Sequence, residues 1–158
     1  MEAEPVASRP WMPGYGIDTG ETGLLPWTWA VERLEGARNY WVATTSPDGG
    51  PHLAAVWGVW TDGALCFSTG EASVKARDLA ANPRCSVSTE QADESVVVKG
   101  IAERVSSDTA ALLEIYQRKY GMGFPDPSEN PVFRVAPRVV IAVRTADFAS
   151  SATRWTVA

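Results

Sequence analysis

The residues with the clearest chemical potential lie in one run, where an apolar strand is followed by a helix. Residues 67–77 read FSTGEASVKAR, so hydroxyl groups and a glycine precede a helical segment that carries Lys75 and Arg77. Hydroxyls and free backbone N–H groups at the start of a helix can hold a phosphate, and the helix dipole and nearby cations strengthen the attraction. The run therefore indicates an anion site. The alternative is that Lys75 and Arg77 lie on a solvated helix face and bind nothing.

Few other residues suggest a reactive centre. His52 is the only histidine, so a metal site or a Ser-His-Asp triad would have to be built around it, and its place in a strand is more typical of a structural residue. The sequence contains neither a G-x-G-x-x-G motif nor a P-loop. Cys66 and Cys85 lack C-x-x-C spacing, and we interpret them as buried thiols in a reducing compartment. These patterns identify no metal site and no catalytic side chain.

Composition restricts the class of protein. A chain of 158 residues fits one domain, and its 45% hydrophobic residues can build a core without disulfide or metal support. The net charge of -5 opposes binding to nucleic acid or to an anionic membrane. No apolar run is long enough to span a bilayer, and the N-terminus lacks the basic start and apolar core of a signal peptide. We therefore expect a cytoplasmic protein, whose 7 Trp residues suggest a large interface or a pocket for a flat ligand.

Local patterns predict a mainly β protein with short helices. Residues 1–26 are rich in Gly, Pro and Thr and should form an irregular arm, which leaves 27–158 as the domain. Helical patterns cover 27–38, 70–81 and 107–120. Apolar and β-branched runs separated by turns predict six antiparallel strands, at 40–45, 52–60, 64–68, 85–89, 95–105 and 138–144. Pro137 should prevent the last strand from running straight back to Val132.

The strand predicted at 52–60 is unusual because it is apolar on both faces. Leu53, Ala55 and Trp57 alternate with Ala54 and Val56. A strand that is buried on both sides suggests a closed barrel whose outer wall meets another layer. That layer could be a helix or a second subunit, and a large apolar patch on a monomer favours a two-fold homodimer.

An ordered set of short segments resembles a known family. The segments are 39–45 (NYWVATT), 47–52 (PDGGPH), 56–60 (VWGVW), 67–69 (FST), 73–75 (SVK), 82–83 (NP) and 152–155 (ATRW). Together they are similar to the pyridoxamine 5'-phosphate oxidase-like superfamily of FMN-binding split barrels, and more narrowly to its flavin/deazaflavin oxidoreductases. The resemblance implies a six-stranded antiparallel split barrel whose cofactor lies across a homodimer interface.

The resemblance also assigns site residues. It implies that the cofactor phosphate is bound by Ser68, Thr69, Ser73 and Lys75. It also implies that the flavin-type ring lies along Val56, Trp57 and Gly58. FMN-binding members usually carry Arg directly before the lysine, whereas this chain has Val74 there. Arg77, one helical turn later, could partly compensate.

The expected function is that of an oxidoreductase that uses the deazaflavin coenzyme F420 for hydride transfer to a small, unsaturated substrate. Three features favour this cofactor over FMN. They are Val74, a composition rich in Ala, Val, Gly and Arg, and three arginines that could meet the acidic tail of F420, namely Arg134, Arg138 and Arg144. The alternatives are an FMN-dependent oxidase or reductase, a non-enzymatic flavin- or haem-binding protein, and a structural dimer with a vestigial pocket. The absence of an evident catalytic acid suits hydride transfer with protonation by solvent.

Overall fold

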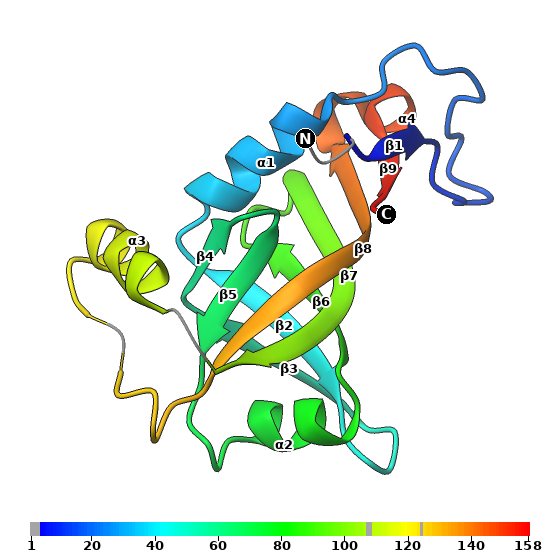
Figure 1. The fold of residues 1–158 in the computed structure, drawn as a ribbon. Coiled ribbons are helices and arrows are strands. Elements are labelled where there is room, and N and C mark those ends of the chain that lie inside the picture. Colours follow the sequence, from blue (N-terminus) through cyan, green and yellow to red (C-terminus); the bar gives the residue numbers. More distant parts are fainter. Residues whose placement is uncertain (1–3, 107–108, 124) are drawn as a thin grey trace.

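The computed structural model describes residues 4–106, 109–123 and 125–158, and these contain nine strands in one antiparallel sheet (Figure 1). The strands are β1 (Val6–Ser8), β2 (Tyr40–Thr45), β3 (Pro51–Val56), β4 (Gly58–Thr61), β5 (Ala64–Ser68), β6 (Arg84–Thr89), β7 (Glu94–Val105), β8 (Val132–Arg144) and β9 (Thr153–Thr156). The helices are α1 (Trp27–Gly36), α2 (Val74–Ala81), α3 (Ala110–Tyr120), η1 (Thr145–Asp147) and α4 (Phe148–Ser151). The mainly β class is confirmed, although strand pairing recruits three more strands than the sequence predicted.

The sheet curls into a barrel that is split between β3 and β4. The strand order runs β1-β9-β8-β7-β6-β2-β3, and β5 pairs with β8 and carries β4 on its other side. The two strands that border the split, β3 and β4, are therefore consecutive in the chain. The single strand predicted at 52–60 is wrong for this reason: the chain bends at Trp57 as it passes from one sheet edge to the other. Just after the bend, Gly58 lets β4 approach β5 closely, because a Cβ there would lie 3.1 Å from the Cys66 carbonyl oxygen.

Alternation along β2 separates a dry barrel interior from an uncovered outer face. Tyr40 and Val42 are fully buried, whereas Trp41 between them is 45% exposed. Trp41 pairs with Ala55 and Ala43 pairs with Leu53, so the same outer face continues onto β3. Leu53 is 61% exposed. The burial of this strand on both sides, which the sequence predicts, is thus absent in the single chain.

A β-bulge carries β8 through Pro137. Gly100 pairs with Pro137 and Lys99 with Val139, so Arg138 has no partner residue and the register shifts between Lys99 and Gly100. A Cβ on Gly100 would lie 2.4 Å from the carbonyl oxygen of Ala136, which explains the glycine. The expected stop before Pro137 is wrong, because the bulge accommodates a residue that has no N–H to donate.

The N-terminal arm is anchored to the end of the barrel. β1 pairs with β9, and the Arg9 guanidinium donates to four carbonyl oxygens: those of Gly20, Thr22, Ser150 and Ala152. The predicted start of the third helix at Ser107 lies outside the described residues, and the described part of that helix begins at Ala110. Across the described ranges, no helix is long and apolar enough to cross a membrane.

Candidate functional site

The end of β5 and the start of α2 form a corner rich in hydrogen-bond donors. Ser73 caps α2, as its oxygen accepts from the Ala76 N–H at 3.2 Å. The Ser73 hydroxyl also lies 3.0 Å from the hydroxyl of Thr69. Within the described residues, the N–H groups of Val74 and Lys75 have no acceptor. Two hydroxyls and two free N–H groups thus gather at the positive end of the α2 dipole.

Lys75 and Arg77 differ in their availability. Lys75 is half-buried and makes no hydrogen bond or ion pair with any described residue. Arg77 instead donates to the Asp78 carboxylate at 3.1 Å, with 60% of its side chain exposed. The lysine is therefore the cation that is free to meet a ligand, whereas the arginine already neutralises a buried carboxylate.

That carboxylate is fully buried and ties α2 to the barrel. Asp78 is 0% exposed and accepts a hydrogen bond from the Thr44 hydroxyl on β2 at 2.8 Å. Burial raises the pKa of Asp78, but the hydrogen bonds from Thr44 and Arg77 outweigh burial and hold the pKa below its ordinary value. This contact fixes the orientation of α2 relative to the sheet.

The turn between β5 and α2 is braced by the segment that leads into β8. The Thr69 N–H donates to the Pro131 carbonyl at 3.2 Å, and the Glu71 N–H donates to the Glu129 carbonyl at 2.9 Å. The Ser68 hydroxyl donates to the Asn130 carbonyl at 3.3 Å. These bonds hold the donor-rich corner in place before any ligand arrives, which lowers the entropic cost of binding.

Strand register brings the second predicted group of residues to the same corner. Gly58 pairs with Phe67, so continuing that register by one residue sets Trp57 opposite Ser68. The three residues of this group are not equally accessible. Val56 and Gly58 are buried, and only Trp57 is partly exposed. Trp57 is therefore the member of the group that can offer a flat surface to a ring.

Helix α3 contacts this segment in a way that the sequence did not reveal. The rings of Tyr120 and Trp57 stack at 4.5 Å with an interplanar angle of 2°. The Tyr120 hydroxyl lies 2.9 Å from both the N–H and the carbonyl oxygen of Gly58. Tyr116 packs against the same indole with a centroid distance of 6.4 Å. The spacing of four residues between the two tyrosines predicted one buried helix face, but nothing in it identified Trp57 as the partner.

Lys119 joins α3 to the barrel beside this stack. Its ammonium donates to the Tyr40 hydroxyl at 2.8 Å and to the Gly58 carbonyl at 3.0 Å. Burial lowers the pKa of Lys119 to about 8, with nearby Arg38 acting in the same direction and Glu90 opposing them. The pKa of Tyr40 is raised, chiefly by its own burial. The backbone at the bend is thus held by two side chains from one helix.

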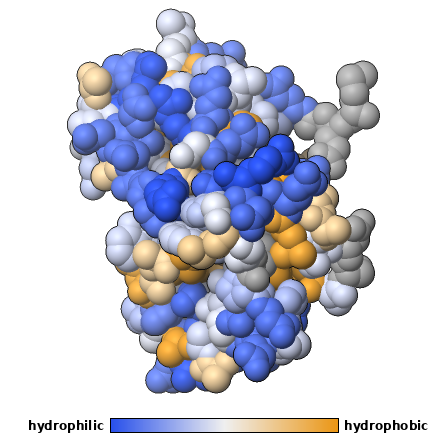
Figure 2. Space-filling view, turned by 90° about the vertical axis from the view of Figure 1, so that its left-hand side faces the viewer, coloured by the Kyte–Doolittle hydropathy of each residue, from blue (hydrophilic) through white to orange (hydrophobic). Residues whose placement is uncertain are grey.

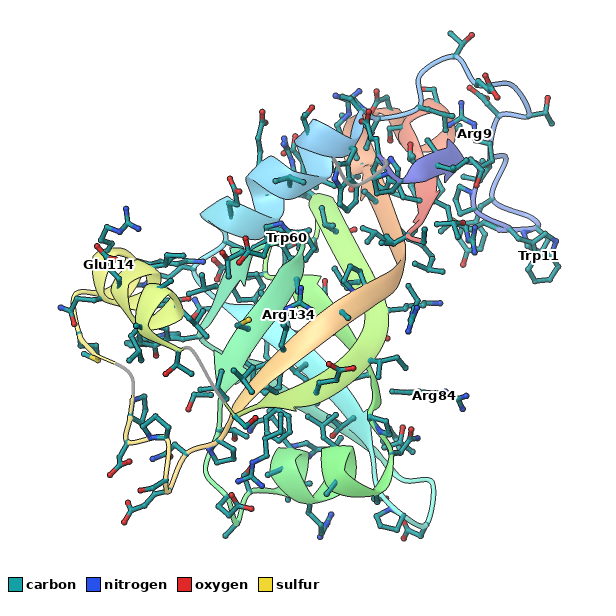
Figure 3. The ribbon with its side chains drawn as sticks, in the orientation of Figure 1. Arg9, Trp11, Trp60, Arg84, Glu114 and Arg134 are labelled. Atoms are coloured by element: carbon teal, nitrogen blue, oxygen red, sulfur yellow. The ribbon has the colours of Figure 1, made fainter. Side chains whose placement is uncertain are left out.

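The outer face of the sheet carries an acid-free groove of about 480 Å³. Its cations are Arg84, Lys99 and Arg138, each exposed and without an ion-pair partner among the described residues. Arg84 extends away from the barrel near α2 (Figure 3). The other two arginines expected to face an acidic group are occupied, since Arg134 donates to the Asp62 carbonyl and Arg144 pairs with Asp147. In a chain with a net charge of -5, this groove is a local positive region.

Comparisons with known proteins agree on the fold. A family model described as pyridoxamine 5'-phosphate oxidase matches residues 30–148. A solved structure described as an F420 reductase is 26% identical, with a TM-score of 0.58, and the match covers 69% of this chain and 93% of that chain. A conserved hypothetical protein from Mycobacterium tuberculosis is 25% identical, with a TM-score of 0.62 and coverage of 73% and 82%.

A heme binding protein from Mycobacterium smegmatis is 21% identical, with a TM-score of 0.60 over 75% of this chain and 55% of that chain, and at this identity the likeness concerns the fold alone. Curated protein sequences gave no match.

Proposed function

Because the chain belongs to the pyridoxamine 5'-phosphate oxidase family of split barrels, we propose that it is an oxidoreductase. In this proposal it uses coenzyme F420 to pass a hydride to a small, unsaturated organic substrate. The observation that carries the proposal is the donor-rich corner between β5 and α2, where Lys75 has no partner among the described residues. The 26% identity to an F420 reductase, over 93% of that protein, supports the choice of cofactor.

The corner fits a phosphate group. The hydroxyls of Thr69 and Ser73 and the free N–H groups of Val74 and Lys75 can surround an anion at the helix start. The Lys75 ammonium adds a charge-assisted hydrogen bond. No carboxylate pairs with this lysine within the described residues, so a phosphate would supply its missing counterion.

The ring of the cofactor would lie beside Trp57, at the bend between β3 and β4. Tyr120 already covers one indole face, and the Arg38 guanidinium lies 5.6 Å from the indole centroid, which leaves the other face for contact. The backbone polar groups of Gly58 are bound by α3, so the cofactor ring would meet an apolar surface there. The adjoining outer residues Trp41, Leu53 and Ala55 extend this surface.

A second copy of the chain completes the proposed site. The corner and the outer face of β2 and β3 are open to solvent in one protomer, and the exposed Trp41 and Leu53 lie on that face. Covering them in a two-fold homodimer would bury apolar surface and enclose the cofactor at the interface. Nucleic acid and membrane are not proposed as partners, and the proposed location is the cytoplasm.

The cationic groove favours F420 over FMN. F420 carries an acidic glutamyl tail that FMN lacks, and the cations of the groove have no counterions on the described residues. Val74 stands where FMN-binding relatives usually carry arginine. An added carboxylate tail would therefore gain contacts that the smaller flavin cannot make.

In this proposal the bound deazaflavin supplies the hydride chemistry, and the protein supplies position and a dry wall. Lys75 and the start of α2 hold the phosphate. Trp57, braced by Tyr120, orients the ring and excludes water from one side. Protonation of the substrate would come from solvent, because Lys75, the unpaired cation of the corner among the described residues, is engaged by the phosphate in this arrangement.

Titration of purified apo-protein with F420 and with FMN tests the proposal. Tryptophan fluorescence should be quenched at a lower concentration of F420 than of FMN, because Trp57 lies beside the ring. Binding of FMN at least tenfold more tightly than F420 would establish the alternative of an FMN-dependent oxidase or reductase. A copurifying flavin or haem without hydride transfer, seen in the absorption spectrum, would establish a non-enzymatic binding protein.

A further inference from the structure

A second cavity has a lining that shares no residue with the groove on the outer sheet face. It has a volume of about 700 Å³ and is bounded by α1, α3 and the β4–β5 hairpin. This volume is typical of a small-molecule site, for which about 300–1,000 Å³ is usual. Figure 2 looks onto the side of the molecule that carries α3, where apolar residues gather across the middle beneath a strongly hydrophilic upper part.

The inner wall of the cavity is apolar and aromatic. Trp27 and Val31 of α1 face Trp60 of β4 and Ile115 of α3. Trp27 and Trp60 meet edge to face at 6.4 Å, so they form one continuous aromatic wall. Trp60 lies beneath α1 (Figure 3). Such a surface suits the flat or aliphatic body of a ligand.

Helix α3 uses two faces for two purposes. Tyr116 and Tyr120 pack against Trp57 at the proposed cofactor corner. Ile115, Arg118 and Lys119 line the cavity toward α1. The cavity is thus a separate space, back to back with the corner and joined to it through the Gly58 carbonyl that Lys119 binds.

Lys119 lines this cavity, and its ammonium has one N–H that no oxygen or nitrogen of the described residues accepts. An ammonium has three N–H donors, and two of them are accepted by the Tyr40 hydroxyl and the Gly58 carbonyl. No described carboxylate lies within ion-pair distance of Lys119. The other charged lining residues, Glu35, Asp62 and Arg118, are exposed at the rim and solvated.

We propose that this cavity binds a small amphipathic carboxylate, with its apolar body between α1, α3 and Trp60 and its carboxylate on the third N–H of Lys119. The carboxylate supplies a direct ion pair, which no carboxylate of the described residues makes with the half-buried ammonium. Because Lys119 also donates to Gly58, occupation of the cavity shifts the backbone beside Trp57. The site stands independently of which cofactor the corner takes.

The test uses naphthalene-2-carboxylate and its uncharged analogue naphthalene-2-methanol as probes, followed by NMR on the full chain. The carboxylate should shift the indole signals of Trp27 and Trp60 and the amide signal of Gly58. The alcohol should bind at least fivefold more weakly. Lys119→Met should remove this difference, because the variant keeps the apolar stem and loses the charge.

Two filling variants and one control complete the design. Ile115→Trp on α3 and Val31→Phe on α1 should each weaken the binding of both probes at least tenfold. If one variant fails to fold, the other still provides the test. Glu114→Gln, on the outer side of α3 (Figure 3), should leave both affinities unchanged.

The proposal is wrong if the carboxylate leaves both indole signals in place, or if Lys119→Met distinguishes the two probes as the wild type does. A dimer that buries the cavity and blocks both probes would also overturn it. Titration of F420 into the same samples gives a separate readout, because failure of the cofactor to bind would refute the proposed function and leave the indole shifts unaffected.

Discussion

Replacement of Lys75 by alanine separates a ligand-binding lysine from a solvated one. Lys75 lies one residue after the start of α2 and has no protein partner among the described residues. If it donates a charge-assisted hydrogen bond to the cofactor phosphate, its loss should cost about 1.5–3 kcal/mol of binding energy. That range corresponds to a dissociation constant weakened about 10- to 150-fold.

The same substitution should have little effect on the stability of the folded state. No described ion pair or hydrogen bond is lost with the Lys75 side chain, so the free energy of unfolding should stay within about 0.5 kcal/mol of the wild type. Fluorescence titration measures affinity, and urea unfolding measures stability. A parallel loss of both would show that the weaker binding arises from damage to α2.

Arg154→Ala is the matched control for net charge. Arg154 lies on β9, at the end of the barrel away from α2, and within the described part of the chain its guanidinium donates only to Thr156 Oγ1. Both variants lose one unit of positive charge, but the charge of Arg154 is far from the corner and is screened there, whereas the local hydrogen bond is lost only in Lys75→Ala. Equal affinities of the two variants for the cofactor would indicate that Lys75 is a solvated residue that does not bind the phosphate.

Three further predictions concern assembly, pH and packing. Light scattering at micromolar concentration should give the mass of two chains for the wild type and of one for Leu53→Glu, and a monomeric wild type would exclude the interface. The depressed pKa of Asp78 means that its ionised form stabilises the fold above the ordinary pKa of 3.8, and that this stability is lost as the pH falls through the lower pKa of the folded state. In urea unfolding measured over a series of pH values, Asp78→Asn should therefore reduce the loss of stability at acid pH. An unchanged loss would refute this. Gly100→Ala should destabilise by about 1–3 kcal/mol through its contact with Ala136, whereas Gly36→Ala, with open space around it, should not; equal unfolding midpoints would contradict the close approach.

Short-range chemistry was predictable from the sequence. The cap at Ser73 and the end of α2 before Asn82 are confirmed, since a hydroxyl cap and a following Asn-Pro act within a few residues. The Asp62-Gly63 turn is also confirmed, with positive φ at both residues. Both cysteines are free and buried, as their spacing indicated.

The sequence by itself determined the mainly β class and gathered the donors between β5 and α2, because neighbouring residues build both. Only the tertiary structure decided that the chain bends at Trp57, that Arg77 is committed to Asp78 and that α3 braces the bend through Tyr120. The physical reason is that these features depend on which distant surfaces meet. Alternation of apolar residues continues unbroken across Trp57, so the pattern contains no mark of the point where the chain changes sheet edge. That point is set by closure of the barrel, which couples residues far apart in the chain.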